Sequence, residues 1–371
     1  MGHALLSASE PPCGVHWISY IIKNHSMSSF WSKLKKPIFA MAPLANVTDV
    51  VFREIIARHG KPDVFYTEFV SADGLTSKGR EILLRDLKYT ENQRPIVAQF
   101  FTSRPENMFK AASLARELGF DGVDINMGCP DKSVVKQGAG AALIKNPVLA
   151  KEIIAAAKEG TRSTSRGQAD LPVSVKTRLG YNKIEIDTWI HTLLETNIAA
   201  LAIHLRTVKE MSKTPAHWEM LAEIVKMRNA TRFAGVSARR ASKKSKTLII
   251  GNGDVMTLEE GRRKAKETGA DGIMFGRAMF GNPFLFRTRP RNKNAPTEAS
   301  ERPITTQEKL KLLLEHVELF EEIWGDAKDF NIMKKHFKAY VSGFDGASGL
   351  RAKLMEAKNA EGVKKILATA L

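Results

Sequence analysis

The chain has 371 residues, 43% of them hydrophobic and 26% charged, a composition that can bury a core and that excludes an intrinsically disordered chain. No run approaches the roughly 18 uninterrupted apolar residues of a membrane span, and two cysteines, Cys13 and Cys129, are too few for a disulfide framework or a cysteine-rich metal site. The net charge of +17 favours a polyanionic partner such as a nucleic acid, although a generally basic proteome would give the same excess. We expect a cytoplasmic protein without a metal centre.

The first residues carry no persuasive targeting signal. Residues 1–26 contain short apolar pieces, but no basic segment leads into an apolar stretch of about 7–15 residues, and no small-residue cleavage site follows. Met27 begins a more ordinary start. We therefore interpret residues 1–33 as an N-terminal extension that is either not native or disordered.

Residues 34–287 alternate between short apolar runs and amphipathic stretches with helical spacing. The predicted strands are Pro37–Ala42, Val64–Thr67, Pro95–Phe100, Gly122–Asn126, Pro172–Lys176, Leu201–His204, Thr247–Gly251 and Gly272–Gly276. The predicted helices between them include Asp49–His59, Glu106–Leu118, Pro147–Glu159, Ile184–Thr196, Trp218–Arg228 and Leu258–Thr268. Eight such units in about 250 residues are typical of an α/β fold of the (β/α)8 TIM-barrel type. The sequence has no G-x-G-x-x-G motif after the first strand, which argues against an open Rossmann sheet.

The pattern changes after residue 287. Residues 288–303, rich in proline, arginine and polar residues, predict a linker, and residues 304–371 predict an all-helical domain with a start signal at Thr305 and Glu308. Just before the seventh strand, the basic run 226–246 holds eight lysines or arginines and no acidic residue. That run is either a solvated loop or a contact for RNA.

The carboxyl ends of the strands locate the expected site, because TIM barrels hold their active sites there. Glycines at two neighbouring ends would let the backbone approach an anion, and Arg277 adds a guanidinium. Lys176 would point a cation into the barrel mouth, or else form a buried ion pair. The predicted cofactor-binding residues are Ala42, Pro43, Gln99, Lys176, His204, Asn252, Gly253, Asp254, Gly276 and Arg277.

Cys129 follows the fourth strand in a Gly-Cys-Pro loop. An unperturbed thiol has a pKa of about 8.5, so at neutral pH it is mostly protonated and can serve as a general acid. A lone cysteine is otherwise a small buried hydrophobe. Arg206 alternates to the same face as His204, which makes it a second candidate contact for an anion or a substrate.

Taken together, these residues resemble the tRNA-dihydrouridine synthases. The resemblance is carried by Met41–Asp49 with Phe52-Arg53, Thr67-Glu68, Val97–Gln99, Asp124–Pro130, Gly138–Ala141, Val175–Gly180, His204–Thr207, Gly251–Asp254, Gly269–Arg277 and Gly281–Pro283. It covers the whole predicted barrel, and Leu350–Leu354 in the tail is similar to the RNA-binding domain of the family. Two positions depart from the pattern: Asn46 and Leu205 stand where the family usually has glycine.

The resemblance implies a flavoenzyme in which NADPH or NADH reduces FMN and the flavin passes hydride to C6 of a uridine in tRNA. Cys129 would protonate C5, Asn126 would position the uracil, and His204 and Arg206 would hold the flavin or the base. The uridine would be extruded from the tRNA into the barrel mouth. For the helical domain, the predicted tRNA contacts are Lys334, Lys335, Lys338 and Arg351. We expect a monomer.

Two other functions remain open at this stage. One is an FMN barrel that acts on a small molecule, such as a dihydroorotate dehydrogenase or an ene-reductase. The other is a catalytically idle RNA-binding relative. The helical tail, the charge and the Cys-Pro loop argue against the first, and the presence of Cys129, Lys176 and His204 argues against the second.

Overall fold

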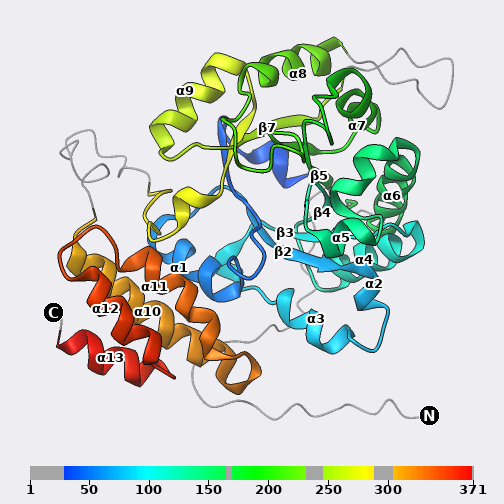
Figure 1. Ribbon diagram of the computed structural model, residues 1–371. Coiled ribbons are helices and arrows are strands. Elements are labelled where there is room, and N and C mark those ends of the chain that lie inside the picture. The colour runs from blue at the N-terminus through cyan, green and yellow to red at the C-terminus, as the bar shows by residue number, and fades with distance from the viewer. Residues whose placement is uncertain (1–28, 164–168, 231–244, 288–303, 370–371) are drawn as a thin grey trace, which may run out of the picture.

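The computed structural model describes residues 29–163, 169–230, 245–287 and 304–369 (Figure 1). Eight parallel strands form one sheet in the order β1-β8-β7-β6-β5-β4-β3-β2. They are β1 (Ile38–Met41), β2 (Phe65–Ser71), β3 (Ile96–Phe101), β4 (Gly122–Met127), β5 (Val173–Arg178), β6 (Ala200–His204), β7 (Leu248–Asn252) and β8 (Gly272–Phe275). The ring closes between β1 and β2 through a bridge from Ala40 to Val64, where Met41 N–H donates to the Val64 carbonyl at 3.0 Å. The predicted TIM barrel is confirmed.

Helices surround this barrel, as the alternating pattern predicts. The larger ones are α1 (Val50–Gly60), α4 (Pro105–Glu117), α6 (Pro147–Gly160), α8 (Glu219–Ala230) and α9 (Leu258–Thr268). The predicted helix 184–196 begins instead as a π-helical turn, Ile186–Ile190, and continues as α7 (His191–Glu195). The short helices α2 (Ala72–Leu75), α3 (Arg80–Asp86) and α5 (Lys132–Lys136) lie in loops where the sequence pattern predicts no element.

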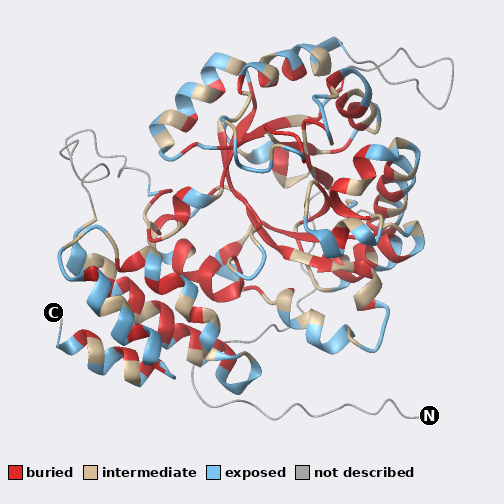
Figure 2. Cartoon of the chain, in the orientation of Figure 1, coloured by how far each residue is buried: buried red, intermediate tan, exposed pale blue. Residues whose placement is uncertain are grey.

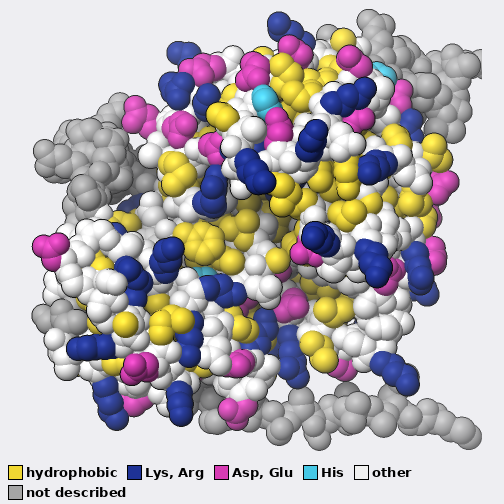
Figure 3. All heavy atoms as spheres, viewed as in Figure 1, with side chains coloured by type: hydrophobic (Ala, Val, Ile, Leu, Met, Phe, Trp, Pro, Cys, Tyr) yellow, Lys and Arg dark blue, Asp and Glu magenta, His cyan; other side chains and the backbone are white. Residues whose placement is uncertain are grey.

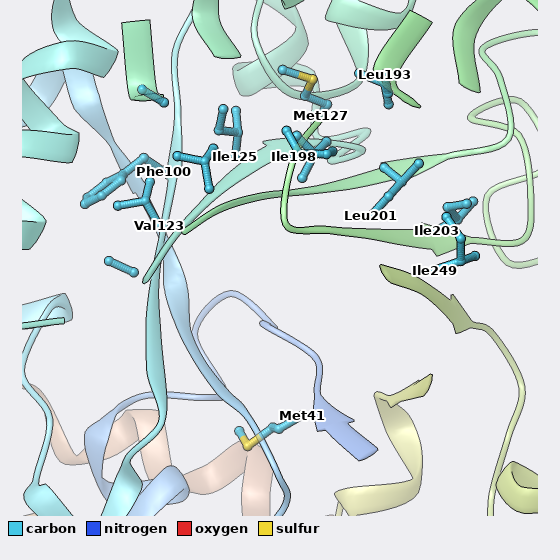
Figure 4. Close-up of a cluster of buried hydrophobic side chains, with 14 of the residues drawn as sticks. Met41, Phe100, Val123, Ile125, Met127, Leu193, Ile198, Leu201, Ile203 and Ile249 are labelled. Carbon is cyan, nitrogen blue, oxygen red and sulfur yellow. The ribbon is translucent and has the colours of Figure 1, made fainter. Parts of the chain in front are cut away.

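The main core lies between the strands and the outer helices. Figure 4 shows side chains from it, among them Phe100, Val123, Leu201 and Ile249. Figure 2 shows the strands as almost entirely buried, while the outer helices alternate buried and exposed faces. This burial on both sides explains why the strands read as continuous apolar runs in the sequence.

A second cluster fills the inside of the barrel and reaches upstream of β1. Trp31, on the 3-10 turn Phe30–Lys33, is 5% exposed and packs with barrel-interior residues such as Ile38 and Tyr66. Phe30 lies 3.4 Å from where a side chain on Gly122, the first residue of β4, would begin, so this turn covers the amino end of the barrel. Residues 30–33 are predicted to belong to the extension, but in the structure they pack on the barrel. Residues 1–28 are outside the described residues.

Strand β2 differs most from its prediction. Its register against β3 shifts between Tyr66, which pairs with Val97, and Phe69, which pairs with Gln99. The extra residue is a β-bulge, and the strand runs on to Ser71. Thr67 and Glu68 therefore lie inside the strand and not at its end.

The helices after residue 304 form a second layer against one side of the barrel. They are α10 (Thr306–Trp324), α11 (Lys334–Tyr340), α12 (Ala347–Glu356) and α13 (Ala360–Ala368), with 3-10 turns at Gly325–Ala327 and Phe330–Met333 before α11. The start signal predicted at Thr305 and Glu308 is confirmed as a capping box. Val50, Val51 and Ile55 of α1 belong to the same hydrophobic cluster as α10 and α11, so this domain packs directly on α1 (Figure 1).

Candidate functional site

A cavity of about 310 Å³ opens at the carboxyl ends of the strands. Most of the predicted site residues line it: Ala42, Pro43, Asn126, Cys129, Lys176, His204, Asn252, Gly253, Asp254, Gly276 and Arg277. Leu44, Ala45, Val255 and Met274 add apolar surface to the wall. On the face shown in Figure 3, lysine and arginine side chains surround a central area of apolar side chains. The cavity combines an apolar wall with several cations.

Strand register brings the polar lining residues together at one level. Asn126 on β4 is opposite Lys176 on β5, and Arg178 on β5 is opposite His204 on β6. His204 is in turn opposite Asn252 on β7. Side chains two apart on a strand share a face, so the parallel register itself assembles the site from residues far apart in the sequence.

The Cys129 loop is held by Asn126. The Asn126 Oδ1 accepts the backbone N–H groups of Gly128 at 3.1 Å and Cys129 at 2.9 Å. Behind the loop, Ala141 N–H donates to the Cys129 carbonyl at 3.0 Å. The thiol is half-buried, and this burial raises the pKa of Cys129 above its ordinary value. Cys129 is therefore a protonated thiol at the cavity wall, the form that a proton donor needs.

Gln99 lies behind the wall. It is fully buried, donates from Nε2 to Asp124 at 2.6 Å and accepts from Asn126 Nδ2 at 3.1 Å. The structure therefore places Gln99 one layer below the cavity surface, where it orients Asn126. The predicted direct contact with a cofactor is not visible in this arrangement.

A lysine in the cavity wall and a buried carboxyl behind it carry opposite charges. Asp124 accepts from Ser174 Oγ at 2.5 Å, and burial raises the pKa of this carboxyl to about 6. Burial lowers the pKa of Lys176 to about 8, an effect that neighbouring Arg178 increases and Asp124 opposes. The Lys176 ammonium is thus held with little solvent, so an anionic group in the cavity would interact with it strongly.

Arg178 is the functional candidate that sequence reasoning missed. Its Nε donates to the Gly128 carbonyl at 3.0 Å, and its Nη1 lies 3.3 Å from His204 Nδ1. Its spacing of two from Lys176 on one strand was the signal that could have identified it. Burial, together with the positive charges of Lys176, Arg178 and Arg206, lowers the pKa of His204 to about 2. His204 is therefore a neutral imidazole among cations.

The ends of β7 and β8 form a corner suited to a phosphate. Asp254 accepts from Arg277 at 2.8 Å and also from Arg206, so it orders both guanidinium groups. A side chain added at Gly276 would meet only the Ala42 methyl, at 3.9 Å, so the space above this glycine is open to a ligand. Arg206 itself is 2% exposed and also donates to the Thr214 carbonyl, which places it beside the cavity and off its surface.

The predicted tRNA contacts of the helical domain lie away from the cavity lining. Lys338 is exposed and Lys334 is half-buried on α11. Arg351 donates to the Val341 carbonyl at 2.8 Å, and the Lys335 ammonium donates to the Asn46 carbonyl. Of the basic run 226–246, residues 231–244 lie outside the described residues.

None of the helices among the described residues has the length and apolar character needed to cross a membrane. Across the same residues, histidine, cysteine, aspartate and glutamate nowhere gather in a group of three that could hold a metal ion.

Comparisons with known proteins point to one family. A family model described as "Dihydrouridine synthase (Dus)" matches residues 40–371. The chain is 40% identical over 342 residues to a "Probable tRNA-dihydrouridine synthase 2" of Bacillus subtilis, covering 91% of this chain and 95% of that protein. It is 38% identical to a "Probable tRNA-dihydrouridine synthase" of Staphylococcus aureus, covering 91% and 94%.

Solved structures with similar folds include a morphinone reductase, with a TM-score of 0.47 and 14% identity over 72% of this chain and 89% of that one. Another is an old yellow enzyme homologue from Zymomonas mobilis, with a TM-score of 0.42 and 16% identity over 67% and 86%.

Proposed function

Because the chain belongs to the dihydrouridine synthase family, we propose that it reduces specific uridines of tRNA to 5,6-dihydrouridine with bound FMN and a nicotinamide reductant, NADPH or NADH. The observation that carries this proposal is the cavity at the barrel mouth. Its wall carries the Cys129 thiol together with Lys176, Arg178 and Arg277, which supports a site for an anionic ligand beside a proton donor.

The cavity residues fit a phosphorylated flavin. Arg277, the open space at Gly276 and the start of the loop at Gly253 would hold the phosphate. Lys176 and Arg178 would face the part of the ring system that gains negative charge on reduction. When bound, the flavin would supply the hydride for C6 of the uracil.

Cys129 would supply the proton for C5. Its raised pKa keeps the thiol protonated at neutral pH. The N–H groups of Gly128 and Cys129, which both donate to Asn126 Oδ1, would fix where the sulfur lies. A positioned general acid contributes about 10²–10⁴-fold to a rate. The neutral His204 adds no proton at this pH and would serve as a hydrogen-bonding group for the ligand.

The excess of positive charge suits tRNA as the substrate. A folded RNA presents many phosphates, and the net charge of +17 would attract it over a distance. Because the reacting bond lies within a stacked base, the uridine would leave the stack to reach the cavity. The exposed Lys338 on α11 is a candidate phosphate contact.

A reoxidation experiment tests the proposal. The purified protein is loaded with FMN, reduced by NADPH without oxygen, and mixed either with tRNA lacking dihydrouridine or with free uridine. We expect rapid flavin reoxidation and new dihydrouridine only with tRNA, and a rate about 10²-fold lower for Cys129→Ala with flavin reduction unchanged. Reoxidation by a free pyrimidine but not by tRNA would instead identify a small-molecule reductase.

A further inference from the structure

The loop after β1 has two sides with different neighbours. Residues 42–45 line the cofactor cavity, whereas Asn46, Val47 and Asp49 line a second, small pocket together with residues of the helical domain. The two halves are tied together, because the Leu44 carbonyl accepts the N–H groups of both Val47 and Thr48 at 3.0 Å. The Leu44 N–H also donates to Thr48 Oγ1 at 2.9 Å. A displacement of the outer half would therefore move the cavity wall.

Two side chains of the helical domain hold the outer half. Lys335 on α11 donates to the Asn46 carbonyl, and Trp324 Nε1 at the end of α10 donates to Asp49 Oδ2 at 2.9 Å. From the barrel side, Glu68 accepts the Val47 N–H at 3.1 Å. Hydrogen bonds with the bulge of β2 on one side, and with helices α10 and α11 on the other, therefore hold the loop in place.

The backbone conformation of Asn46 explains why these hydrogen bonds are needed to hold the loop. Its φ is 57°, in the left-handed region that glycine adopts freely and other residues adopt at a cost, although asparagine tolerates it better than most. This is one of the two positions where the chain departs from the glycine usual in the family. The carbonyl that Lys335 binds belongs to this same residue, so the bond stabilises the peptide next to the unfavourable φ.

Helix α11 also contacts the loop on the other side of the cavity. Gly281, four residues after Arg277, lies so close to the Ala339 carbonyl that an added side-chain carbon would be 2.2 Å from it. Phe280 stacks on His336 with ring centroids 6.2 Å apart. One helix therefore contacts the segments after β1 and after β8, and both segments line the cavity.

We propose that Lys335 is a positioning residue for the cofactor cavity, and not a tRNA phosphate contact: by holding the Asn46 carbonyl it makes flavin affinity depend on how the helical domain is seated. The inference rests on the proposed function, since FMN is the ligand measured. It also implies a coupling. If tRNA shifts the seating of α11, it changes flavin affinity, and by thermodynamic linkage flavin changes tRNA affinity by the same factor.

The test measures FMN affinity of the full-length apoprotein by quenching of flavin fluorescence. Lys335→Met keeps the length of the side chain and removes its donor, while Lys335→Arg keeps a donor. Lys311→Met is the matched control, because it removes the same charge from an exposed lysine of α10. We expect Lys335→Met to raise the Kd for FMN about three- to tenfold, the scale of one hydrogen bond from a charged donor after allowance for solvent. Lys335→Arg and Lys311→Met should stay within about twofold of wild type.

The outcomes separate this inference from the proposed function. A wild-type protein that binds no FMN overturns the proposed function and this inference with it. An equal Kd for FMN in the wild type and Lys335→Met overturns only the role of Lys335. A Kd for Lys335→Arg that is as high as that of Lys335→Met does the same. Thermal unfolding of the apoproteins serves as a check on folding. A loss of FMN affinity by Lys335→Met with unchanged apoprotein unfolding supports the positioning role.

Discussion

Replacing Gly140 with alanine should disturb the loop that carries the proposed proton donor, Cys129, without changing the thiol itself. Gly140 has a φ of 58°, which costs an ordinary residue about 1–2 kcal/mol. A side-chain carbon there would lie 2.7 Å from Val134 Cγ1 and 2.9 Å from the Cys129 carbonyl oxygen, well inside normal contact. Overpacking of this kind costs about 1–3 kcal/mol. If the loop keeps its position, unfolding free energy should fall by about 2–5 kcal/mol.

Alternatively, the Cys129 loop moves, because the new methyl group would clash with the backbone of that loop. The thiol would then shift by several tenths of an ångström, and misplacement of a reacting group by about 1 Å can cost 10²-fold in rate. We therefore expect Gly140→Ala to lose stability, to slow tRNA reduction by about tenfold or more, or to do both, while reduction of the flavin by NADPH stays near the wild-type rate.

Denaturant unfolding and single-turnover reduction of tRNA measure the two effects. Gly349→Ala is the control, because Gly349 lies in α12 with no atom within 4 Å of an added side-chain carbon. It should be neutral or stabilise the helix by up to about 1 kcal/mol. A Gly140→Ala protein with wild-type stability and wild-type tRNA reduction would refute this account of the Cys129 loop.

Two further predictions concern pH. Burial raises the pKa of Asp124 to about 6 in the folded state, so ionisation of this carboxyl destabilises the fold as the pH rises from 4 to 6. The unfolding free energy of Asp124→Asn should therefore gain about 2 kcal/mol on that of the wild type between pH 4 and pH 7. Denaturant unfolding of both proteins at the two pH values measures this difference, and a difference that does not change with pH would contradict the reasoning. Because burial raises the pKa of the Cys129 thiol, loss of its proton should not slow tRNA reduction below about pH 8.5. Lys176, with a pKa of about 8, loses its charge first, so a decline that begins near pH 8 belongs to Lys176. A decline centred near pH 7 in single-turnover rates would contradict the role of the thiol.

Much of the barrel could be predicted because its strands and helices are encoded by short stretches of the sequence. Continuous apolar runs and helical spacing identify strands without knowledge of their neighbours, and β6 and β8 differ from their predicted bounds by a residue at one end. The bulge in β2 has no such local signal. It depends on how β2 pairs with β3, and it is what carries Phe69 to the cavity lining.

The site residues divide in the same way. Cys129 and Lys176 could be singled out because each follows or ends a strand in a distinctive motif. The position of Gln99 behind Asn126 could not be inferred, because inward-facing residues at different heights in a barrel look alike in the sequence. Lys335 shows the limit most clearly, since spacing on a helix identifies a basic face but not the carbonyl, 289 residues earlier in the chain, that one of its lysines binds.

The turn around Trp31 changes where the barrel can be cut. Residues that precede the first strand cover the amino end of the barrel. A domain boundary drawn from the strand pattern would therefore remove the Trp31 side chain, which is 5% exposed. Loss of a buried tryptophan costs about 3–5 kcal/mol, a large share of what holds a domain together. A barrel excised at residue 34 would expose the apolar side chains at the amino end of its interior, whereas one that begins at Ser29 keeps them covered by Trp31.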